Sequence, residues 1–106
     1  GPPSSQQASA MRASINAKVL PPWNGCPVSG LDTERLRARV VFSLDRQGRV
    51  TSVADPQVTG ITDSNSPQVA RFGECAVRAI RTAAPYSLPA EHYDHWKNYT
   101  LNFRKQ

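Results

Sequence analysis

Residues 36–44 carry the pattern that most limits what this chain can fold into, because apolar side chains occupy every second position. These apolar residues are Leu36, Ala38, Val40, Phe42 and Leu44. The intervening side chains are mostly polar, so the pattern predicts a strand with one buried face and one solvated face. Asp45–Gly48 then supplies a turn, and Arg49–Val53 is expected to return as a shorter strand of a hairpin.

A first helix is predicted before this hairpin. Residues 6–19 are rich in good helix formers, and their apolar side chains recur at helical spacing, at Ala8, Met11, Ile15 and Val19. Leu20, Pro21 and Pro22 are expected to end the helix, because proline cannot donate a backbone hydrogen bond and restricts the residue before it.

A second helix is expected to begin at Ser66 and Pro67, which resemble an N-cap followed by proline in the first turn. Its apolar stripe is formed by Val69, Phe72, Ala76, Ile80 and Ala83. Glu74 and Arg78 are spaced to form an ion pair across one turn, and Pro85 closes the helix.

The last predicted element is a strand in which Tyr99, Leu101 and Phe103 alternate with polar residues. The order helix, strand, strand, helix, strand predicts an α+β fold, with a three-stranded antiparallel sheet and helices packed on one face. The last strand most simply joins the free side of the first strand, which leaves its own outer edge unpaired. Residues 1–5 are expected to be a mobile tail or linker end, and 6–106 a single domain.

The charge balance of the chain bears on its partners but does not name a function. The 106 residues include 13 Lys and Arg against 8 Asp and Glu, which favours acidic or anionic partners. Glu91, His92, Asp94 and His95 form the one cluster considered for metal binding or proton transfer, but no third ligand or nucleophile signature accompanies it. We therefore expect no metal and no cofactor, and a small enzyme that uses His92 and His95 is kept as an alternative.

Nucleic-acid binding is an alternative, because Arg35, Arg37 and Arg39 alternate with apolar residues on one strand and could face phosphates. No aromatic side chain lies among them on the exposed face, so bases would have no stacking platform. A solvated basic face is the preferred interpretation.

The two cysteines, Cys26 and Cys75, leave two alternatives open. They are either a disulfide, which would indicate a periplasmic or secreted protein, or two independent reduced thiols.

Most of residues 36–103 resembles the C-terminal periplasmic domain of TolA, particularly the alphaproteobacterial type, and more distantly the C-terminal domain of TonB. The resemblance is carried by VVFSLDRQGRV (40–50), CAVRAIRTAAPY (75–86), LPAEHYDHW (88–96) and YTLNF (99–103), with PPWN (21–24) as a looser match. It implies a non-enzymatic periplasmic domain within a longer protein that an N-terminal helix anchors in the inner membrane. The start at Gly1-Pro2, without an initiating Met, also suggests a fragment.

The resemblance further implies that the full protein joins a proton-driven inner-membrane motor and transmits force during envelope constriction. TolB is the expected partner, and colicin or phage proteins exploit related domains. A TonB-like role toward outer-membrane receptors is the alternative. In either case we expect a partner to add a strand to Asn98, Tyr99, Thr100, Leu101, Asn102 and Phe103. Asn98, Thr100 and Asn102 are the expected side-chain contacts, because Tyr99 and Phe103 are predicted to face the core.

Overall fold

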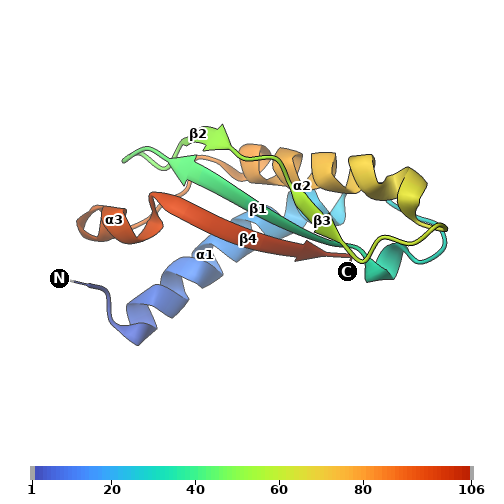
Figure 1. Cartoon of the computed structure of the whole chain (residues 1–106). Helices are drawn as coiled ribbons and strands as arrows, with labels where there is room; N and C mark the ends of the chain where they lie inside the picture. The colour runs from blue at the N-terminus through green and yellow to red at the C-terminus, as the bar shows by residue number, and fades with distance from the viewer. Residues whose placement is uncertain (1, 106) are drawn as a thin grey trace.

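The alternating segment forms β1, Arg37–Leu44, which is the central strand of an antiparallel sheet (Figure 1). The structure is a computed structural model that describes residues 2–105. Every second residue of β1 is buried, whereas Arg37, Arg39 and Val41 are exposed. The prediction of a strand with one buried face is therefore confirmed.

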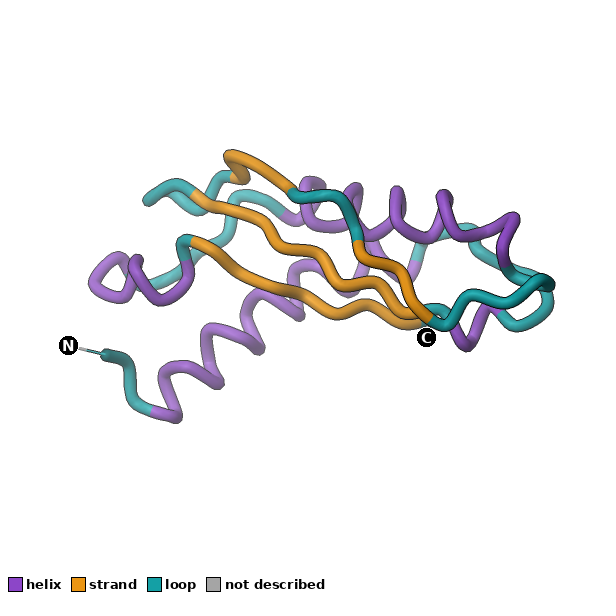
Figure 2. Tube along the Cα trace, viewed as in Figure 1, coloured by secondary structure: helices purple, strands orange, loops and turns teal. Residues whose placement is uncertain are grey.

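Two long helices, α1 (Ser5–Asn24) and α2 (Val69–Ala83), lie on the same side of the sheet (Figures 1 and 2). They pack against each other and bury the apolar face of the strands. A third helix, the single turn α3 (Tyr93–Trp96), precedes the last strand. Short 3-10 turns at Thr33–Arg35, Ser66–Gln68 and Ala90–His92 complete the described helical segments. The α+β class is confirmed.

The sheet has four strands, so the prediction of three strands is wrong. β4 (Asn98–Arg104) pairs with β1 along its length, from Ser43 opposite Asn98 to Arg37 opposite Arg104. On the other side of β1, β2 (Val50–Val53) pairs with its C-terminal part and β3 (Gln57–Thr59) with its N-terminal part. β2 and β3 therefore follow each other along one edge. The strand β3 spans only three residues, between Pro56 and Gly60, and is too short to show a period in the sequence.

The prediction that the first helix ends at Leu20 is also wrong, because α1 continues through Pro21 and Pro22 to Asn24. The prolines remove the donors that Ala17 and Lys18 carbonyls would normally use, but both of these residues are exposed, so water can replace the donors. Packing favours the longer helix. Trp23 lies in the core, with its ring centroid 5.1 Å from that of Phe72 and 4.8 Å from that of Phe103.

At its other end α1 begins one residue earlier than the predicted domain start. Ser4 and Gln7 form a capping box, in which the Gln7 amide donates to Ser4 Oγ (3.1 Å) and the Ser4 amide donates to Gln7 Oε1 (2.7 Å). Ser5 therefore belongs to the helix and not to a tail, whereas Gly1 lies outside the described residues.

The second helix does not use Ser66 as its N-cap. Residues Ser66–Gln68 form a 3-10 turn, and the residue that organises this entry is Asn65, which is fully buried. Its side chain accepts from the Thr62 amide (2.7 Å) and donates to the carbonyls of Asp32 (2.8 Å) and Gly60 (3.0 Å). The predicted apolar stripe of α2 is buried from Phe72 to Ala83, with Val69 half-buried.

A disulfide joins Cys26, in the loop after α1, to Cys75 on α2, with 5.8 Å between the Cα atoms. Of the two alternatives for the cysteines, the disulfide is thus the one present. The predicted ion pair between Glu74 and Arg78 is wrong: residues 2–105 contain pairs at Arg35–Asp32, Arg49–Asp45 and Lys97–Asp94, and none on α2. An exposed pair of this kind stabilises a helix by only a few tenths of a kcal/mol.

Candidate binding edge

The outer edge of β4 is unpaired within the described residues, since β1 is the only strand that pairs with it there. The register shows which backbone groups point outward. The Leu44 amide donates to the Lys97 carbonyl (2.8 Å), and hydrogen-bonded positions alternate along an antiparallel pair. Tyr99, Leu101 and Phe103 therefore direct their backbone groups toward β1, whereas Asn98, Thr100 and Asn102 direct their N–H and C=O groups outward.

The end of this edge is closed by the first helix. The Trp23 indole donates from Nε1 to the outward carbonyl of Arg104, at 2.8 Å. This contact agrees with the register. Arg104 is two positions after Asn102, so its carbonyl also points away from β1. The unpaired part of the edge thus runs from Asn98 to Asn102.

Side chains of β4 divide between the two faces of the sheet. Leu101 and Phe103 are buried on the helix side and Tyr99 is half-buried there, with its ring centroid 6.0 Å from that of Phe42. Asn98 and Asn102 are exposed on the open face. Thr100 is partly exposed opposite Val41, an unusually exposed valine in mid-strand.

A groove runs beside this edge, between β4 and α1. It has two adjoining parts, of about 510 and 400 Å³, which share Asn16, Leu101 and Asn102. The first part is mainly apolar and includes Leu20, a large apolar side chain that is 44% exposed. Arg12 lines the second part, next to Tyr99 and Thr100. A strand added to β4 could place alternate side chains in this groove.

Sequence reasoning did not find the contribution of α1 to this site. Arg12, Asn16 and Leu20 lie on one side of the buried stripe of α1, and the groove exists because the helix runs beside β4. Leu20 was the one available signal of this contribution, because it is an apolar residue that falls outside the helical spacing of Met11, Ile15 and Val19.

The structure separates the two histidines of the cluster considered for metal binding. His92 ends the 3-10 turn before α3, with φ of −112° and ψ of 23°, whereas His95 lies within α3 and is exposed. Nδ1 of His92 is buried without a hydrogen-bond partner in the described part of the chain. Within residues 2–105, no group of three or more potential ligands gathers around a common point.

The three arginines considered for nucleic-acid binding are divided by the structure. Arg37 and Arg39 lie on the open face of β1, but Arg35 belongs to a 3-10 turn and pairs with Asp32 at 3.9 Å. Arg37 donates to the carbonyls of Glu34 (2.8 Å) and Leu36 (2.9 Å), which holds its guanidinium near the start of the strand. The prediction of three arginines on one strand is wrong for Arg35.

No family model matches this chain, and no curated protein is significantly similar to it. Among the described helices, none combines the length and apolarity needed to cross a bilayer.

Proposed function

We propose that this chain is a non-enzymatic periplasmic protein-binding domain of a Tol-Pal-type energy-transducing envelope protein. The observation that carries the proposal is the unpaired edge of β4 beside the groove along α1. The edge presents donors and acceptors at Asn98, Thr100 and Asn102, and the groove offers pockets for side chains. The resemblance of residues 36–103 to TolA C-terminal domains supplies the biological setting.

In the proposed mechanism, an extended segment of a partner pairs with β4 and continues the sheet. Three outward-facing residues each offer one N–H and one C=O group. A backbone hydrogen bond contributes about 0.5–1.5 kcal/mol net, so this short edge gives modest affinity that side chains in the groove would increase. Such an arrangement suits a reversible link that transmits force.

The disulfide supports the proposed compartment. Structural disulfides persist in oxidising environments such as the bacterial periplasm and are rare in the cytosol. The bond between Cys26 and Cys75 ties the end of α1 to α2, next to Trp23 and the groove. It therefore stabilises the part of the domain that shapes the proposed site.

In the full protein, an N-terminal helix would anchor the chain in the inner membrane and join it to the motor subunits. A TolB-like periplasmic protein is the proposed physiological partner. Colicin or phage segments could use the same outer edge of β4. A TonB-like role toward outer-membrane receptors remains the alternative function.

The test is an NMR titration of the ¹⁵N-labelled domain with a synthetic peptide from the N-terminus of TolB, using matched variants at Thr100. Thr100→Pro removes an outward N–H and leaves the bonds to β1 in place, so the fold should persist. Thr100→Ala changes the side chain and keeps the N–H. We expect Thr100→Pro to weaken binding about tenfold and Thr100→Ala less than twofold.

Each result of this titration has a defined meaning. Shifts concentrated on 98–103 that are lost in Thr100→Pro would support strand addition. Equal binding by a folded Thr100→Pro variant would refute it, and Asn102→Pro repeats the test if the first variant does not fold. No shift with the TolB peptide, but shifts with peptides from TonB-dependent receptors, would replace the Tol-type role with the TonB-like role.

A further inference from the structure

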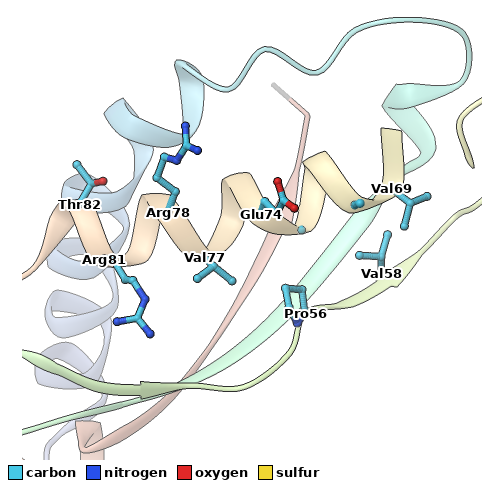
Figure 3. Close-up of a pocket in the computed structure, with 10 residues that line it drawn as sticks. Pro56, Val58, Val69, Glu74, Val77, Arg78, Arg81 and Thr82 are labelled. Carbon is cyan, nitrogen blue, oxygen red and sulfur yellow. The ribbon is translucent and has the colours of Figure 1, made fainter. Parts of the chain in front are cut away.

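A second groove lies on the opposite side of the domain, between α2 and the β2–β3 edge (Figure 3). Its volume is about 720 Å³, which is larger than either part of the groove beside β4. Its lining is predominantly apolar and includes Pro56, Val58, Val69 and Val77. Such a surface is typical of a site that receives apolar side chains.

Gly73 lies where α2 passes the β3 segment. A Cβ atom at Gly73 would lie 3.4 Å from the Pro56 ring and 3.8 Å from Val58. Because the glycine carries no side chain, α2 and the β3 segment approach each other closely at this point. The groove is lined on one side by α2, between Val69 and Thr82, and on the other side by Pro56 and Val58.

The charged side chains along this groove are Glu74, Arg78 and Arg81, so their net charge is positive. Arg78 and Arg81 lie along α2 at the groove, and both are exposed. Figure 3 shows Val77 and Arg81 extending from α2 toward the β2–β3 segment, whereas Glu74 and Arg78 extend to the other side of the helix. None of the ion pairs in residues 2–105 involves an arginine of α2, so the Arg81 guanidinium is available to an acidic ligand.

The length of the groove along α2 suits an extended ligand. It follows α2 from Val69 to Thr82, a length of about 20 Å at the helical rise of 1.5 Å per residue. An extended chain covers this length with about six residues. The register of β3 adds one feature. Arg37 and Arg39 direct their backbone groups toward β3, so Val58, which lies between the paired residues, directs its own N–H and C=O away from β1, at the outer edge of the sheet.

We propose that this groove binds an extended acidic protein segment, with aliphatic side chains against Val58 and Val77 and a carboxylate at Arg81. The site goes beyond the proposed function, since it lies on the other edge of the sheet and has different chemistry. Its position allows the domain to hold two protein segments at once, one on β4 and one beside α2.

The experiment uses the peptide Gly-Ser-Glu-Leu-Asp-Leu-Glu-Ser, titrated into the ¹⁵N-labelled domain, with a second peptide in which lysine replaces each acid. We expect saturable shifts at 56–58 and 69–82 with the acidic peptide alone. Arg81→Glu should weaken binding roughly fivefold or more, because attraction becomes repulsion. Arg71→Glu makes the same charge change on an exposed residue outside the groove and should change binding less than twofold.

Other results would overturn the proposal. These are the absence of shifts, equal binding of both peptides, or equal effects of Arg81→Glu and Arg71→Glu. Val77→Thr keeps the side-chain shape and replaces a methyl group with a hydroxyl, so it should weaken binding severalfold and repeats the test if Arg81→Glu is unstable. Thr100→Pro should leave binding of the acidic peptide unchanged. If Thr100→Pro abolished this binding and the groove variants did not, the peptide would be assigned to β4 and the second site would be refuted.

Discussion

Removal of the disulfide tests how far this domain depends on the link between α1 and α2. The double variant Cys26→Ala/Cys75→Ala opens a loop whose ends are 49 residues apart in the sequence. In the chain-entropy model, a crosslink closing a loop of this length stabilises the folded state by about 4 kcal/mol, because it restricts the unfolded chain. For a domain of 106 residues, this corresponds to a decrease in Tm of roughly 15–20 °C.

The assay is urea unfolding of the oxidised protein and the double variant, followed by tryptophan fluorescence and by circular dichroism. The difference in unfolding free energy should be about 4 kcal/mol. Reduction of the wild-type protein should give a similar decrease, which separates loss of the bond from the change of side chains. A difference below about 1 kcal/mol, with both probes showing one transition, would refute the assignment of this stability to the crosslink.

Two further predictions concern stability at the hairpin end of the sheet. Gly48 has a φ of +79°, and a Cβ there would lie 1.8 Å from the Tyr86 carbonyl oxygen. Gly48→Ala should therefore destabilise the fold by about 2 kcal/mol or more, as measured by thermal melts. Gly25→Ala is the control, because Gly25 has a φ of −81°, and it should be nearly neutral in the same melts. Burial raises the pKa of Tyr86, whose hydroxyl donates to the Ile80 carbonyl at 2.8 Å. The folded state therefore retains this proton at a pH where the unfolded chain loses it, so the stability is fully present below about pH 10 and is lost as the pH rises further. Tyr86→Phe should lower stability by about 1 kcal/mol at neutral pH and reduce this alkaline loss; an unchanged alkaline loss in urea melts would assign it to other groups.

The long periodic elements were predictable from the sequence, because each has one buried face. Alternation identified β1 and β4, and helical spacing identified the stripe of α2. The pairing of β4 with β1 followed from the hairpin, which left one side of β1 free. The outer edge of β4 could therefore be anticipated, although its function remains a proposal.

Features that depend on distant contacts were not predictable in this way. Local rules end a helix before Pro21, but packing of Trp23 against Phe72 and Phe103 extends α1. The three residues of β3 pair with β1 and carry no period of their own. Both grooves depend on where helices pass the sheet edges, so their lining residues come from segments far apart in the sequence.

Amide hydrogen exchange along β4 tests the central claim most directly, because it reports each backbone N–H separately. In the free domain, the amides of Tyr99, Leu101 and Phe103 should be protected by β1, whereas those of Thr100 and Asn102 should exchange rapidly. When the TolB peptide binds, exchange of the Thr100 and Asn102 amides should slow at least tenfold. Protection of these two amides in the free domain, or rapid exchange in the complex, would contradict strand addition at this edge.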